Sequence, residues 1–115
     1  MNIEDELNSL KKNFNQLSEN PTRWGLSTCS TVVKDFADTV AKDDSSLHKN
    51  LLKVATQIQT DMATHLSRSN QAYFSADNSS LPSQFEHYFK QIKGYVEDPD
   101  NQEYLKSSII QPNIT

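Results

Sequence analysis

Apolar side chains return every three or four residues along most of this chain, and that spacing places them on one face of an α-helix. The first run consists of Ile3, Leu7, Leu10, Phe14 and Leu17. Only two glycines and four prolines occur among the 115 residues, which leaves too few turn-forming residues for a many-stranded sandwich or barrel. The sequence therefore predicts an all-α fold.

Four long amphipathic segments and one shorter segment follow one another along the chain. Their apolar periods and capping residues predict helices at about 2–18, 28–42, 46–68 and 82–97 and a short fifth helix at about 99–108. Pro21 and Gly25 predict a loop over residues 18–27, and a polar stretch without a clear period predicts another over 67–81. Because the first three helices are joined by short connections, we expect antiparallel neighbours in a small four-helix bundle.

The apolar content suits one hydrophobic core. Apolar residues make up 35% of the chain, so we expect residues 1–115 to form a single helical domain, with residues 109–115 as a flexible tail. The near-heptad spacing within 46–68 also suits a coiled-coil seam between two chains. A homodimer is therefore an alternative to a bundle formed by one chain.

Charge and cysteine content limit the partners and compartments that suit this chain. Fifteen acidic and eleven basic residues give a net charge of −4, whereas DNA-binding domains normally carry a basic stripe that neutralises phosphates. The first residues are acidic, no apolar run approaches the roughly 20 residues that cross a bilayer, and Cys29 is the only cysteine. We therefore expect a cytoplasmic protein that does not bind a membrane, and nucleic acid ranks below another protein as its partner.

No combination of residues predicts a catalytic or metal site. Asp61 and His65 lie four residues apart, as do Asp44 and His48, but neither pair has the third ligand that a zinc site needs. The chain has no Gly-x-Ser-x-Gly elbow and no glycine loop that would bind a phosphate. We expect no cofactor, and we expect that the protein is not an enzyme.

Cys29 is expected to be a structural thiol. No lysine or histidine adjoins it in the sequence to lower its pKa, and Val33, four residues later on the predicted helix, is apolar. This pattern indicates a buried cysteine that acts as a small apolar side chain, and not as a nucleophile.

Aromatic residues are concentrated towards the end of the chain. Seven of the ten fall there, namely Tyr73, Phe74, Phe85, Tyr88, Phe89, Tyr95 and Tyr104. They exceed what one helical face can hide, so those near acidic residues are candidates for a docking face, and a thick aromatic core beneath the last two helices is the alternative. Trp24 has the same two interpretations, and a loop tryptophan more often plugs the open end of a bundle than serves as an exposed anchor.

Residues 61–75 loosely resemble a helix-turn-helix. Ala63 would lie in its first helix and Ser69 would begin its second. The second helix of such a motif normally carries several basic residues for phosphate contacts, and this segment has Arg68 alone. A DNA-binding regulator is therefore the third-ranked function.

A small acidic helical chain without catalytic motifs is typical of a protein that covers the surface of another protein. Our first expectation is an inhibitor or immunity-type protein whose carboxylates cover a basic partner, such as a nuclease toxin. The alternative is a self-associating helical subunit of a secretion or phage assembly. The expected partner-binding residues are Trp24, Tyr73, Phe74, Tyr95, Glu97, Asp98, Asp100, Glu103 and Tyr104, with a second acidic patch at Asp35, Asp38, Asp43 and Asp44.

Overall fold

The computed structural model describes residues 2–68 and 78–107, and within these ranges it is helical without any strand. The elements are α1 (Ile3–Glu19), α2 (Arg23–Thr28), α3 (Ser30–Val40), α4 (Ser46–Ser67), α5 (Leu81–Glu97) and the 3-10 helix η1 (Pro99–Tyr104). The all-α prediction is confirmed, and the bounds predicted for α1, α4 and α5 agree with the observed ones to within one residue at each end.

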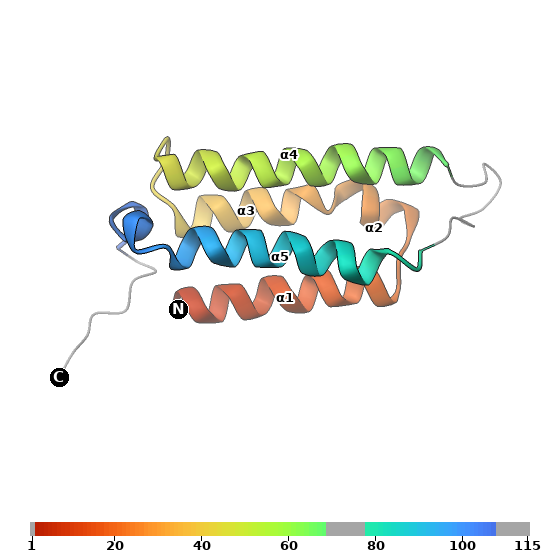
Figure 1. Ribbon diagram of the computed structural model, residues 1–115, viewed down its shortest axis with the longest axis horizontal. Coiled ribbons are helices and arrows are strands. Elements are labelled where there is room, and N and C mark those ends of the chain that lie inside the picture. The colour runs from red at the N-terminus through yellow and green to blue at the C-terminus, as the bar shows by residue number, and fades with distance from the viewer. Residues whose placement is uncertain (1, 69–77, 108–115) are drawn as a thin grey trace.

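Four helices run alternately up and down and close into a bundle (Figure 1). α1 packs against α3 and α5, and α4 packs against the same two helices from the other side. The four long helices therefore follow one another around the bundle in their order along the chain, which is the arrangement that short connections favour. The predicted four-helix bundle is confirmed.

The core is continuous through the bundle, and every long helix contributes to it. Its larger side chains include Leu7, Leu10 and Phe14 of α1, Val33 and Phe36 of α3, Leu51, Ile58 and Met62 of α4, and Phe85, Ile92 and Val96 of α5. The rings of Phe14 and Phe85 meet with their centroids 5.2 Å apart. The apolar stripes found in the sequence are therefore the surfaces that this one chain buries against itself.

The aromatic side chains of α5 and η1 form a thick aromatic core, which is one of the two interpretations expected from the sequence. Phe85 and Tyr88 are buried, and Phe89, Tyr95 and Tyr104 are partly buried against the core. Tyr73 and Phe74, the other two aromatic residues of this part of the chain, lie outside the described residues. So do residues 109–115, which the sequence predicts as a tail, and most of the loop predicted over 67–81.

The loop predicted over residues 18–27 contains a helix, so that prediction is wrong in its second half. α2 begins after Thr22, whose Oγ1 accepts a hydrogen bond of 2.9 Å from the backbone N–H of Gly25. This cap satisfies one of the free N–H groups at the helix start. Cys29 then has helical backbone angles, φ −66° and ψ −22°, so α3 follows α2 without an intervening loop.

The fifth helix, predicted at about 99–108, is a shorter 3-10 helix. The amides of Asn101 and Gln102 donate hydrogen bonds of 2.9 Å to the backbone oxygens of Tyr95 and Val96, which fold η1 back onto the end of α5. These bonds satisfy carbonyls that the end of an α-helix leaves free. They also fix the chain direction, so the segment does not continue as an α-helix.

The residues after η1 pair with the end of α3. Ala41 and Leu105 form an isolated antiparallel bridge, in which Lys42 N donates to Tyr104 O at 2.7 Å and Lys106 N donates to Val40 O at 2.8 Å. The side chain of Leu105 is buried in the core. This pairing fastens the last described residues across the end of the bundle.

No helix in the described ranges is both long enough and apolar enough to cross a membrane.

We expect Leu105→Ala to lower the free energy of unfolding by about 2–5 kcal/mol, because a buried leucine is replaced and a cavity remains. Urea denaturation followed by circular dichroism measures this. Glu103→Ala is the control, since Glu103 is exposed on η1 and its loss should change stability by less than about 0.5 kcal/mol. Equal stability of the two variants would show that Leu105 does not anchor the segment.

Candidate acidic docking face

The fold brings the two acidic patches predicted from the sequence to the same end of the bundle. At this end α1 begins, α3 ends, α4 begins and α5 ends, with η1 lying across them (Figure 1). We define the acidic end as the carboxylates in the terminal helical turns and connections there, namely Glu4, Asp5, Glu6, Asp38, Asp43, Asp44, Glu97, Asp98, Asp100 and Glu103. They are ten of the fourteen aspartates and glutamates that the structure describes, and all except Glu6 are exposed. Asp35, also predicted for the second patch, lies one turn further into α3.

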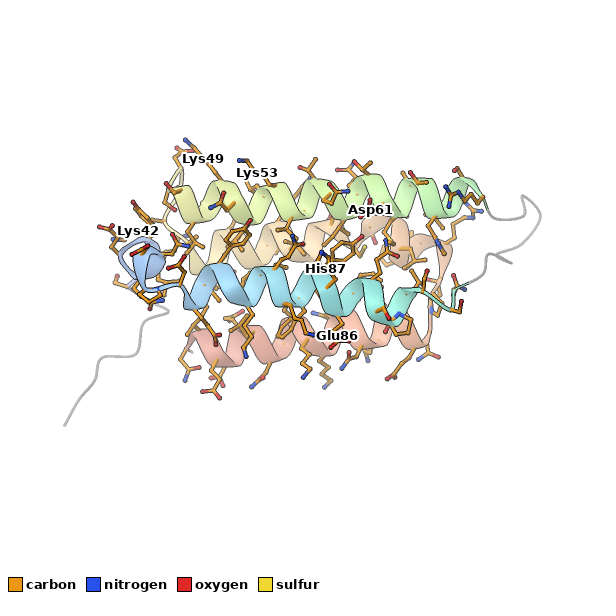
Figure 2. All side chains as sticks on the ribbon, in the orientation of Figure 1. Lys42, Lys49, Lys53, Asp61, Glu86 and His87 are labelled. Carbon is orange, nitrogen blue, oxygen red and sulfur yellow. The ribbon has the colours of Figure 1, made fainter. Side chains whose placement is uncertain are left out.

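Only three basic residues lie in the same turns and connections, namely Lys42, Lys49 and Lys106. Figure 2 shows Lys42 at this end and Lys49 on the outer side of α4. Over the rest of the described chain, eight basic residues outnumber four acidic ones. The molecule is therefore electrically polar along the bundle, with its negative charge at one end.

The positions of these carboxylates differ in what they do for the fold. Glu4, Asp5 and Glu6 occupy the first turn of α1, where negative charge interacts favourably with the helix dipole. Asp38 and Glu97 lie in the last turns of α3 and α5, where the dipole disfavours them and where neither helix has a basic residue. Helix stability explains the first group and does not explain the second.

One cluster at the acidic end has the residue types of a metal site. Single ligand atoms of Asp38, Asp43 and His48 lie within 4.8 Å of one another. His48 Nε2 is 2.8 Å from Asp38 Oδ1, so His48 pairs with Asp38 and not with Asp44, which the spacing had suggested. Lys106 Nζ lies 3.8 Å from Asp43 Oδ1 and donates to the backbone oxygen of Asp38. Because Lys106 already pairs with Asp43 and His48 with Asp38, we assign the cluster to ion pairing and hydrogen bonding.

Asp61 and His65, the second acid–histidine pair seen in the sequence, bind different side chains and not each other. The Tyr88 hydroxyl donates to Asp61 Oδ2 at 2.5 Å, and Gln57 Nε2 donates to Asp61 Oδ1 at 2.7 Å. His65 Nε2 is 2.8 Å from Asn78 Oδ1. Burial, together with the hydrogen bond to Asp61, raises the pKa of the Tyr88 phenol above its ordinary value, so this phenol keeps its proton. Asp61, which Figure 2 labels on α4, thus ties α4 to α5 through Tyr88.

Cys29 is buried at the junction of α2 and α3, as expected from the sequence. Its thiol donates to the backbone oxygen of Leu26 at 3.2 Å. Burial raises the pKa of the Cys29 thiol from 9.0 to about 11. A hydrogen bond from the backbone of Cys29 itself lowers this pKa by a smaller amount. A thiol that stays protonated at neutral pH is a poor nucleophile.

Trp24 does not plug the end of the bundle, so the interpretation favoured by the sequence is wrong. Its side chain is 76% exposed on α2. The reason is that α2 is a helix, whose inward side is already occupied by Leu26. α2 also lies at the end of the bundle opposite η1 (Figure 1), so the structure separates Trp24 from the other described members of the predicted partner-binding set.

The segment that resembles a helix-turn-helix is only partly described. Its first half belongs to α4, which continues to Ser67, and residues 69–75 lie outside the described ranges.

No family model, curated protein or solved structure matches this chain.

We expect Cys29 to react with a thiol reagent such as dithionitrobenzoate at pH 8 only when the protein unfolds. Between pH 9.0 and about 11 the unfolded chain loses the thiol proton while the folded protein keeps it, so the free energy of unfolding should fall as the pH rises. Cys29→Ala should remove this part of the pH dependence. Fast labelling of the folded protein at pH 8, or the same pH dependence in both proteins, would contradict the buried protonated thiol.

Proposed function

We propose that this chain is a non-catalytic protein-binding module whose acidic end docks on a basic surface of another protein. An inhibitor or immunity-type protein that covers the active surface of a basic partner is the form of this function that we favour. The observation that carries the proposal is the gathering of carboxylates at one end of the bundle, including positions where helix stability disfavours them.

The energetic argument concerns Asp38 and Glu97. Each lies at a helix C-terminus, where a negative charge costs about 0.3–1 kcal/mol. His48 and Lys93 offset part of this cost, with Lys93 Nζ at 3.9 Å from Glu97 Oε1. Charges that a fold tolerates at a cost are commonly charges that a binding partner uses.

The electrostatic argument concerns the rate of encounter. A surface of one sign at one end of an elongated molecule orients an oppositely charged partner before contact, and this raises the association rate. The rest of the described chain carries more basic than acidic residues, so the attraction is directed to the acidic end.

The apolar stripe of α4 supports a binding module over the self-associating subunit. Leu47, Leu51, Ile58 and Met62 have the near-heptad spacing that suits a dimer seam, and all four are buried in the core of this chain. A second copy could pair with that stripe only if the bundle opened.

The test is capture from a host lysate with two charge-reversed baits. Asp100→Lys/Glu103→Lys makes the charge of η1 more positive by four units. Both positions are exposed, and neither is the capping residue Asp98. Glu19→Lys/Glu86→Lys makes the same charge change at two exposed positions, of which Glu19 lies at the end of the bundle opposite η1 and Glu86 near its middle (Figure 2). We expect the wild-type protein and the second variant to retain one stoichiometric basic protein that salt releases, and the first variant to lose it.

Each alternative result removes the proposal. Retention of the same partner by both variants would show that the acidic end is not the docking face. Recovery of only further copies of this chain, at low salt and at high salt, would favour the self-associating subunit.

A further inference from the structure

α1 and α3 pack less extensively than the other neighbouring pairs of the bundle, and a groove follows their contact. We call it the α1/α3 seam, and it runs along α1 between Glu6 and Asn20 and along α2 and α3 between Trp24 and Thr39. Its larger part has a volume of about 670 Å³ and its smaller part about 260 Å³. Asn13 and Val32 line both parts, so the two parts adjoin end to end.

The larger part of the α1/α3 seam is lined without any charged side chain. Leu17 and Val32 are partly buried on its floor, and Trp24 stands at its edge with 76% of its surface exposed. Gly25 brings α2 close to α1, because a Cβ at this position would lie 3.1 Å from Cδ2 of Leu17. Over the described surface, Trp24 is the one large apolar side chain that is exposed.

The smaller part of the seam carries negative charge. Glu6 and Asp35 line it from opposite sides, and no lysine or arginine lines either part. Neither carboxylate has an ion pair within the described ranges. The seam therefore changes from neutral and apolar beside Trp24 to negatively charged where it approaches the acidic end.

The length of the seam matches a short helix. From Glu6 to Asn20 the axis of α1 rises about 21 Å, which is the length of about 14 helical residues. A stable pair of copies buries about 1,200–2,000 Å² in total, and a surface with one large exposed apolar side chain offers little of the apolar centre that such a pair needs. A single amphipathic helix laid in a groove needs only a few apolar anchors.

We propose that the α1/α3 seam binds an amphipathic helix of a partner, with apolar anchors against Leu17, Val32 and Trp24 and basic residues beside Glu6 and Asp35. The inference rests on the proposed function, because it names the segment of the basic partner: a helix that would extend from the acidic end along the surface groove between α1 and α3. The charge gradient along the seam also sets the direction in which that helix lies.

Trp24 is the only tryptophan of the chain, so its fluorescence reports occupation of the seam directly. The probe is a 14-residue synthetic peptide that lacks tryptophan and tyrosine, with leucines on one face of its first two turns and arginines on the same face of its last two turns. We expect the emission of Trp24 to shift to shorter wavelength and its quenching by acrylamide to fall as the peptide binds. A peptide with glutamate in place of arginine should bind at least about tenfold more weakly.

Two asparagine variants of α1 provide matched controls. Asn13→Arg places a bulky cation in the middle of the seam, and Asn15→Arg makes the same change on the side of α1 that faces α5. Both positions are exposed, so circular dichroism should show an unchanged helical content. Asn13→Arg should weaken peptide binding at least about tenfold, and Asn15→Arg by less than about twofold.

Three results would overturn the inference. They are the absence of any Trp24 response up to about 1 mM peptide, equal binding by the two arginine variants, and a Trp24 shift that grows with protein concentration alone, which would assign the seam to a second copy. The proposed function fails separately, through unchanged partner capture by Asp100→Lys/Glu103→Lys, because neither residue lines the seam.

Discussion

The backbone pairing between Ala41 and Leu105 determines what this bundle presents to other molecules. Two hydrogen bonds and the burial of Leu105 hold the chain after η1 against the end of α3. Residues 64 positions apart in the sequence are thereby neighbours. The pairing holds the carboxylates of η1 beside those of the α3–α4 connection, which form two separate patches in the sequence.

The same pairing concentrates like charges, which destabilises the end of the bundle. Part of this repulsion is offset locally, because Lys106 lies 3.8 Å from Asp43 and His48 pairs with Asp38 at 2.8 Å. The apolar core beneath, with Leu105 and Val40 buried, supplies the stability that permits the arrangement. Binding sites commonly depend on such an exchange of stability for function. In this chain the unfavourable charge repulsion is confined to the acidic end of the bundle.

The sequence predicted those elements whose side chains alternate between core and solvent in a helical period. α1, α4 and α5 bury regular apolar stripes, and their caps are local residues such as Asn2 and Ser45. α2 could not be found in this way, because its six residues bury only Leu26 and its cap, Thr22, directly follows a proline. The exposure of Trp24 follows from that short helix, so it was missed for the same reason.

Seven of the ten carboxylates of the acidic end were predicted from the sequence, but Glu4, Asp5 and Glu6 were missed, and the arrangement was not predicted. The carboxylates are visible in the sequence, whereas their meeting at one end depends on the order in which the helices close into the bundle and on the pairing of Ala41 with Leu105, which no local pattern indicates. The same holds for the pairing of His48 with Asp38 in place of Asp44, since it depends on how α3 and α4 pack. The α1/α3 seam results from small and polar side chains on two helices that face each other, so it too is a property of packing.

The central claim is that the acidic end steers and binds a basic partner. The most direct measurement is the association rate constant of the captured partner between about 50 and about 300 mM salt, for the wild-type protein and for Asp100→Lys/Glu103→Lys. Our account predicts a rate constant for the wild-type protein that falls at least about tenfold over this range, and a much smaller fall for the variant. Rate constants that are insensitive to salt, or equally sensitive in both proteins, would contradict it.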